Sequence, residues 1–147
     1  MEHLEWGNPV AGWRLSLSLD RKEFQPEQRI VATIVFQNIS DREQRFGGHG
    51  PVFDYVLDCR MDYGQKVPPT LFGKTMLANR ELVRTVGGAL QAKQQVVVEI
   101  SLTRLLDLSL PGKYLVNVSR QVDASASGAP SDPFIVSNTV AFELKEQ

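Results

Sequence analysis

Apolar and polar residues alternate along much of this 147-residue chain with the period of two that is typical of β-strands. The alternation is clear in five segments, each of which has one apolar row of side chains and one polar or mixed row. A sixth segment, Arg29–Phe36, is apolar on both faces, which predicts a strand in the middle of a sheet. These strands, separated by turns that contain Gly, Pro, Asn and Asp, predict a β-sandwich or a β-barrel.

The alternation also predicts which side chains face the core, because an apolar row is buried where one face of a sheet packs against another layer. The predicted inward rows are Trp13, Leu15, Leu17 and Leu19; Phe53, Tyr55, Leu57 and Cys59; Val96, Val98, Ile100 and Leu102; Tyr114, Val116 and Val118; and Phe134, Val136, Val140, Phe142 and Leu144. The length is close to that of one domain and is sufficient for an independent core. Residues 1–147 are therefore predicted to form a single domain.

The pattern predicts almost no helix. Leu102–Leu108 alone has helical spacing, enough for one or two turns. Residues 61–93 contain Pro68-Pro69 and several glycines, and predict one or two short edge strands between longer loops. The small and polar residues 123–132 predict a mobile loop between the last two strands.

The segment Leu108–Tyr114, with the sequence LSLPGKY, stands directly before a predicted strand. It resembles the tyrosine corner of immunoglobulin-like folds, in which a tyrosine near the start of a long strand hydrogen-bonds to the preceding turn. The resemblance implies that Tyr114 is buried and that its hydroxyl donates to backbone in that corner.

Longer segments resemble bacterial immunoglobulin-like domains of uncharacterised function, and similar segments occur in non-catalytic regions of some secreted metallopeptidases. These segments are Trp6–Leu15, Phe24–Gln28, Ser101–Val122 and Ile135–Val140. Phe24–Asn38 is also similar to the bacterial intracellular proteinase inhibitor family. The resemblance implies an all-β fold, an immunoglobulin-like antiparallel β-sandwich of about seven to nine strands.

Charge and composition narrow the classes of partner. Sixteen basic and seventeen acidic residues give a net charge of −1, which argues against nucleic acid as a partner because phosphate binding needs a basic patch. No apolar run reaches the roughly 18–20 residues of a membrane span. The first ten residues lack the basic start and apolar stretch of a signal peptide, so the compartment stays open between the cytosol and export after removal of a signal.

The usual catalytic constellations are not found in the sequence. The two histidines, His3 and His49, are far apart and no HExxH or GxSxG occurs, so neither a catalytic metal nor a serine nucleophile is predicted. Cys59 falls in an apolar row and is interpreted as an inert core thiol. Asp54, Asp58 and Asp62 are interpreted as a solvated sheet face rather than a calcium site. No cofactor is expected.

We therefore expect a non-enzymatic binding module whose partner is a protein, with the oligomeric state left open. The candidate binding residues are Phe46, His49, Tyr63 and Phe72, from the irregular segments 45–51 and 63–88. An alternative interpretation is that Phe46, Leu71 and Phe72 fold back and plug one end of the sandwich. Two other functions stay open: a proteinase inhibitor that presents a loop to an enzyme, and a carbohydrate-binding module. The latter needs a planar row of exposed aromatic rings, for which the candidates are Trp6, Trp13, Phe46, Tyr63 and Phe72.

Overall fold

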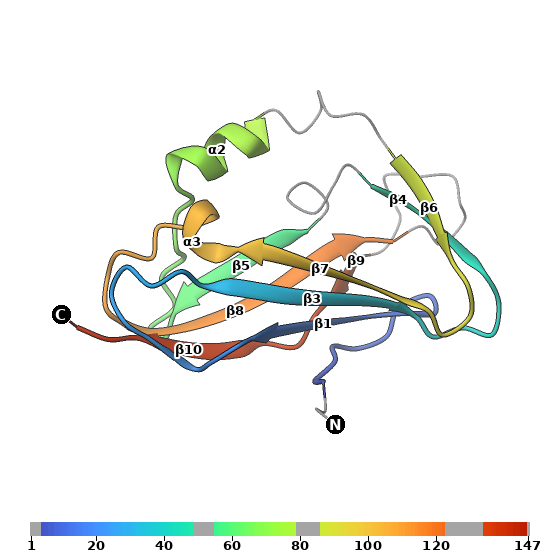
Figure 1. The fold of residues 1–147 in the computed structure, drawn as a ribbon, viewed down its shortest axis with the longest axis horizontal. Helices are drawn as coiled ribbons and strands as arrows, with labels where there is room; N and C mark the ends of the chain where they lie inside the picture. Colours follow the sequence, from blue (N-terminus) through green and yellow to red (C-terminus); the bar gives the residue numbers. More distant parts are fainter. Residues whose placement is uncertain (1–3, 49–54, 79–85, 123–133, 147) are drawn as a thin grey trace.

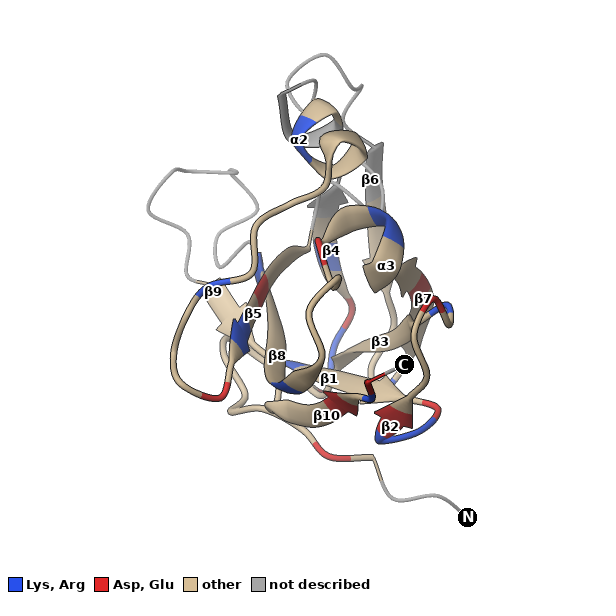
Figure 2. Ribbon diagram, turned by 90° about the vertical axis from the view of Figure 1, so that its left-hand side faces the viewer, with Lys and Arg blue, Asp and Glu red and all other residues tan. Residues whose placement is uncertain are grey.

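The structure is a computed structural model that describes residues 4–48, 55–78, 86–122 and 134–146 (Figure 1). Two sheets pack face to face, as Figure 2 shows from one end of the molecule. Sheet A has the order β1 (Trp13–Leu19), β3 (Val31–Asn38) and β7 (Gln95–Ser101), all antiparallel. Sheet B has the order β2 (Glu23–Phe24), β10 (Val140–Leu144), β8 (Gly112–Gln121) and β5 (Val56–Met61), and β9 (Phe134–Val136) also pairs with β8.

This arrangement confirms the predicted immunoglobulin-like β-sandwich. The described residues form about ten strands rather than seven to nine, because short strands add to the long predicted ones. As the apolar pattern of residues 29–36 predicts, β3 lies in the middle of sheet A. The pairing is antiparallel except between β2 and β10, which run parallel and close one edge of sheet B.

The core lies between the two sheets and is built from the alternating apolar rows. From sheet A, Trp13 stacks on Phe36 with 4.3 Å between ring centroids; from sheet B, Tyr114 stacks on Phe142 at 5.2 Å. All four side chains are buried. Each large apolar side chain buried in this way contributes about 1.5–3 kcal/mol. The predicted rows of β1 and β8 are confirmed, although Ser16, expected on the wet face of β1, is also buried.

The prediction for the last strand was wrong in part. Ile135 is fully buried, whereas Phe134 and Val136 are 56% and 45% exposed. The pairing with β8 explains the inversion. Val136 lies opposite Ser119 and Val140 lies opposite Val116, so the four residue steps from Val136 to Val140 run beside only three residue steps of β8. One extra residue forms a bulge and reverses which side chains face inward. At the bulge, the N–H of Val118 donates to Ser137 Oγ at 2.9 Å instead of to a carbonyl.

A separate two-stranded ribbon folds over one end of the sandwich. It consists of β4 (Gln44–Gly48) and β6 (Val86–Leu90), with Phe46 opposite Gly88 and Gly47 opposite Gly87. A Cβ atom on Gly88 would lie 2.9 Å from Phe46 Cζ, so glycine is needed for the ring to lie over the opposite strand. The segment 45–51, predicted to be irregular, therefore belongs to a strand as far as Gly48, and residues 49–51 lie outside the described part.

The segment 61–93 also contains a helix that the sequence pattern did not predict, α2 (Leu71–Ala78). The Thr70 hydroxyl accepts a hydrogen bond from the N–H of Gly73 at 3.0 Å and so caps the first turn. A Cβ atom on Gly73 would lie 2.4 Å from the carbonyl oxygen of Leu105, so glycine permits close packing against the short helix α3 (Leu102–Leu105). The helical turn predicted from Leu102 is confirmed, while the prediction of strands and loops alone for 61–93 was wrong.

The tyrosine corner is confirmed. Tyr114 is 2% exposed, and its hydroxyl donates to the carbonyl oxygen of Leu110 at 2.5 Å. Burial raises the pKa of the Tyr114 hydroxyl above its ordinary value, so the hydroxyl stays a donor. The bond fixes the segment between α3 and β8 against the sheet.

Candidate functional site

Three of the four candidate binding residues, Phe46, Tyr63 and Phe72, lie on or beside separate elements of the described structure. Phe46 packs edge-on against Trp13 and Phe36, with ring centroids 6.0 and 5.7 Å apart, and its position agrees with the core-plug alternative. Tyr63 is 64% exposed at the end of β5, and Phe72 is 38% exposed on α2, beneath the Arg104 guanidinium at 4.3 Å. His49 lies outside the described residues.

Leu71 does not plug the sandwich, since it is 82% exposed at the start of α2. The plug is made instead by Phe46 together with a buried arginine that the sequence analysis missed. The guanidinium of Arg120 lies 4.4 Å from the ring centroid of Phe36 and 5.7 Å from that of Phe46. A signal existed, because Arg120 continues the inward row of Tyr114, Val116 and Val118. Its charge argued for the surface, although aromatic faces can hold a guanidinium by cation–π attraction.

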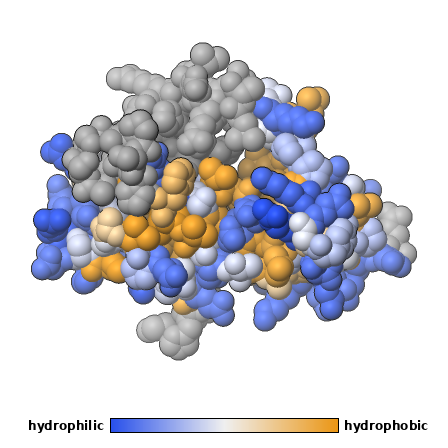
Figure 3. Space-filling view, turned by 180° about the vertical axis from the view of Figure 1, so that it is seen from behind, coloured by the Kyte–Doolittle hydropathy of each residue, from blue (hydrophilic) through white to orange (hydrophobic). Residues whose placement is uncertain are grey.

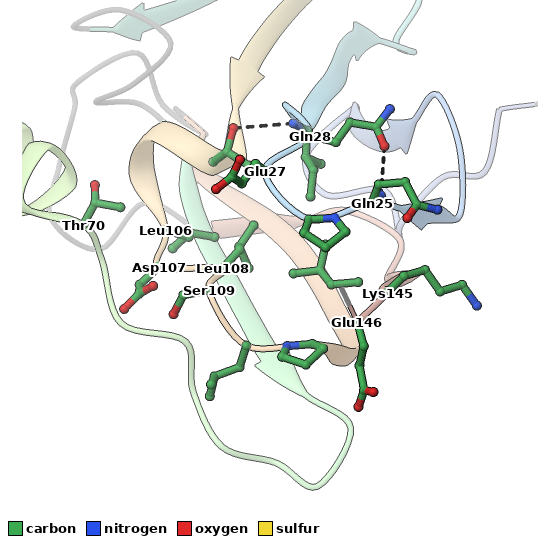
Figure 4. A pocket seen from close by; sticks show the side chains of 16 residues that line it. Gln25, Glu27, Gln28, Thr70, Leu106, Asp107, Leu108, Ser109, Lys145 and Glu146 are labelled. Carbon is green, nitrogen blue, oxygen red and sulfur yellow. Dashed lines mark hydrogen bonds between the residues drawn. The ribbon is translucent and has the colours of Figure 1, made fainter.

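An open groove lies at the end of the sandwich where the C-terminal strand ends, and the sequence analysis did not predict it (Figure 4). Its volume is about 700 Å³, within the range of ligand-binding clefts. Three chain segments and Thr70 bound it: the turn between β2 and β3, the segment between α3 and β8, and the residues that follow β10. The apolar lining residues are Pro26, Ile30, Leu106, Leu108, Leu110, Pro111 and Leu144.

Hydrogen bonds between these segments hold the groove in shape. The turn after β2 has Pro26 in its first corner and Glu27 at a φ of 64°, and the N–H of Gln28 donates to Gln25 O at 3.2 Å. Lys145 N–H donates to Phe24 O at 3.0 Å and ties the C-terminal wall to this turn. Asp107 N–H donates to Pro68 O at 2.9 Å, which fixes the opposite wall. The groove is therefore built before any ligand arrives.

The groove carries an excess of negative charge. Glu27, Asp107 and Glu146 line it, against one cation, Lys145. Lys145 Nζ lies 3.3 Å from Glu143 and 3.5 Å from Glu23, two acids that do not line the groove, and the hydrogen bond with Glu143 raises the Lys145 pKa. Figure 4 shows the Lys145 side chain pointing away from the other labelled side chains, and Figure 2 views this end of the molecule with red segments on β2 and β10.

A second surface feature lies on the outer face of sheet B, where Figure 3 shows apolar side chains gathered between hydrophilic margins. We call it the sheet B strip, and it consists of Val56, Leu115, Phe134 and Val136, each 43–56% exposed. Val56 and Val136 both lie opposite Ser119 of β8, one on either side of it. The bulge after β9 turns Phe134 and Val136 outward and so creates half of the strip.

Metal-binding side chains and the single cysteine are the groups that bear on catalysis within the described part of the chain. Within it, no three His, Cys, Asp or Glu side chains come together in a way that could hold a metal ion. Cys59 is buried, and desolvation, with the nearby Asp58 charge, raises its pKa to about 12, far from that of a reactive thiol. None of the helices in the described ranges has the length and apolar character that crossing a membrane requires.

No family model matches the chain, and no curated protein matches it. Several solved structures are similar to it at low identity. The CARDB domain of a Pyrococcus furiosus protein is 8% identical over 93% of this chain and 97% of that chain, with a TM-score of 0.46. The Pseudomonas fluorescens alkylpurine DNA glycosylase AlkC is 14% identical over 92% of this chain, with a TM-score of 0.46. The beta-glucosidase from Listeria innocua is 15% identical over 91% of this chain, with a TM-score of 0.47.

The chain spans 31% of the AlkC chain and 16% of the beta-glucosidase chain. The fold is described from the strands and sheets of the chain itself. The chain is a small, β-rich domain of immunoglobulin-like kind.

Proposed function

We propose that this chain is a non-enzymatic module that binds a protein partner through the sheet B strip. The observation that carries the proposal is the exposure of four large apolar side chains on one sheet face. Phe134 and Val136 contribute from β9, Leu115 from β8 and Val56 from β5. Large apolar side chains that are exposed together on one face, with polar residues around them, mark interaction sites on otherwise well-packed proteins.

The neighbours of the strip support an interface with a polar rim. Asp58 and Arg60 project from the same face of β5 and pair with each other, Oδ1 to Nε, at 3.0 Å. Leu115 lies opposite Arg60 on one side and Ala141 on the other. An apolar centre with charged and polar residues around it is the usual anatomy of a protein–protein contact.

The carbohydrate-binding alternative has less support. Trp13 is fully buried, and Phe46 packs on Trp13 and Phe36, so neither ring is available for an exposed platform. Tyr63 and Phe72 lie on separate elements, at the end of β5 and on α2. The proteinase inhibitor hypothesis has no specific observation in its favour.

The test compares a double lysine variant on the strip with a single lysine variant on the other sheet. In L115K/V136K, two ammonium groups replace apolar side chains at two points along the strip, on β8 and on β9, and we expect loss of partner retention. V97K is the matched control, because Val97 is 55% exposed on β7 of the other sheet. The wild type and both variants are immobilised and exposed to a lysate of the encoding organism, and the retained proteins are quantified by mass spectrometry.

We expect a protein retained by the wild type and by V97K to be lost from L115K/V136K. Circular dichroism establishes that all three chains are folded. The proposal is wrong if the strip variant retains the same proteins in the same amounts as the control.

A further inference from the structure

We infer that the groove at the end of the sandwich binds an extended segment of a partner protein in which lysine or arginine alternates with leucine-like residues. The inference concerns a surface separate from the sheet B strip and does not depend on it. It rests on the shape of the groove, its apolar floor and its charge.

The floor of the groove is apolar and firmly held. Ile30 is fully buried beneath it, and Leu106 and Leu144 are each 8% exposed. Leu110 stands at the rim and is 57% exposed, although the Tyr114 hydroxyl anchors its carbonyl oxygen. An exposed leucine on a fixed backbone loses little conformational freedom on binding, so its burial by a ligand contributes to affinity with a small ordering cost.

The rim supplies a charge that a cationic ligand would match. Each of the three walls carries one carboxylate: Glu27 on the turn after β2, Asp107 on the segment after α3, and Glu146 after β10. Within the described part of the chain, none of these three carboxylates has an ion-pair partner, while Lys145 is engaged by Glu143 and Glu23. Carboxylates at the mouth of an apolar groove favour a cation whose stem is apolar.

The form of the groove favours a peptide over a small cation. It is open rather than enclosed, and the three carboxylates come from three different walls instead of converging on one point (Figure 4). A chain that places apolar and cationic side chains in alternation would cover the floor and meet the rim at the same time. A lysine or arginine side chain can bury its aliphatic stem and keep its charge near the carboxylates.

The probe is a fluorescein-labelled heptapeptide of alternating lysine and leucine, and binding is followed by fluorescence anisotropy at low salt. We expect the wild type to bind it, and the affinity to fall as sodium chloride is added, because exposed charge pairs are screened. The same peptide with glutamate in place of lysine, or serine in place of leucine, is expected to bind far more weakly.

The variant E27Q/D107N/E146Q removes the three charges and keeps the side-chain shapes. We expect it to weaken binding about tenfold, since exposed charge pairs each contribute a small factor. The matched control is D20N/D41N/E99Q, which removes the same net charge from exposed acids outside the groove and is expected to bind as the wild type does. L110S tests the apolar contact and is also expected to weaken binding. Should the triple variant fail to fold, E27K alone provides the charge test.

Three results would overturn the inference. One is equal affinity of the groove variant and its control for the labelled peptide. Another is equal binding of the glutamate peptide. The third is complete displacement of the peptide by spermidine, together with undiminished binding of the serine peptide, which would make the groove a site for small polyamines. Binding of the lysine–leucine peptide to L115K/V136K as to the wild type separates this inference from the proposed function.

Discussion

Asn38 defines the corner at which β3 leaves sheet A and the ribbon begins. It is fully buried, and its Nδ2 donates to the carbonyl oxygens of Arg42 and Leu90 at 2.8 and 2.9 Å. Its Oδ1 accepts hydrogen bonds from the N–H of Ser40 and from Gln44 Nε2. Because buried polar groups are costly to leave without a hydrogen bond, the bonds of this one amide stabilise the whole corner. A sequence pattern identifies Asn38 as a turn residue but cannot reveal these distant partners.

Cys59 provides a prediction at the scale of one residue. Its pKa of about 12 in the folded protein lies above the ordinary value of 9.0, so the folded state holds its proton more tightly than the unfolded state does. The resulting stabilisation is fully present below pH 9 and is lost as the pH rises towards 12. We expect C59A to show a shallower loss of unfolding free energy than the wild type between pH 9 and 12, as measured by urea denaturation. Burial raises the pKa of Tyr114 in both chains, and the Cys59 charge raises it further in the wild type alone, so the wild type keeps the steeper loss.

The rate of thiol modification provides a second test of Cys59. At pH 8 a thiol reagent should modify Cys59 slowly in the folded protein and rapidly in urea, because the side chain is 1% exposed and its thiolate is scarce. Stoichiometric labelling of the folded chain within minutes would contradict this prediction.

At the scale of elements, the long strands could be predicted from sequence because burial on one face imposes a strict alternation. The row Tyr114, Val116 and Val118 is an example, and all three residues are buried. The errors arose where a local feature interrupts the pattern. A single extra residue between β9 and β10 inverts the facing of Phe134 and Val136, and a threonine cap after two prolines begins α2. Neither feature alters the local pattern of apolar and polar residues, so neither can be recognised from the sequence alone.

Phe46 and Phe72 were both candidate binding residues in the sequence analysis, and the structure places them in different surroundings. F46A removes a ring that packs on Trp13 and Phe36 and lies 5.7 Å from the Arg120 guanidinium. Because the ring is only half-buried, we expect a cost of about 2–3 kcal/mol, below the usual range for a fully buried phenylalanine. F72A removes a partly exposed ring on α2 and should cost less than about 1 kcal/mol. Thermal denaturation of both variants measures the difference, and equal losses of stability would contradict the assignment.

At the scale of the whole molecule, the two sheets are joined by polar contacts as well as by the core. Asn138, which follows β9 of sheet B, acts as a clamp on β1 of sheet A. Its Nδ2 donates to Leu17 O at 3.0 Å, and its Oδ1 accepts from Leu17 N–H at 2.8 Å. The groove and the sheet B strip likewise form only when the whole chain is folded. Each surface joins distant segments, with Glu27 and Glu146 in the groove and Val56 and Val136 in the strip, which explains why sequence reasoning found neither surface.

Residues 1–147 were predicted to form one domain, and unfolding tests that prediction. If the sheets and the ribbon share one core, heat should unfold the chain in a single transition, with equal calorimetric and van't Hoff enthalpies.

N138A removes the clamp and leaves the backbone groups of the buried Leu17 unpaired, so we expect a cost of about 1–3 kcal/mol in unfolding free energy. For a chain of this size the midpoint should fall by roughly 2–4 °C per kcal/mol. N117A is the matched control, since Asn117 lies on the outer face of β8, and its midpoint should stay close to that of the wild type. The chain is not one cooperative unit if the wild type unfolds in two separate transitions. The same conclusion follows if N138A lowers the midpoint of only one part of the unfolding curve.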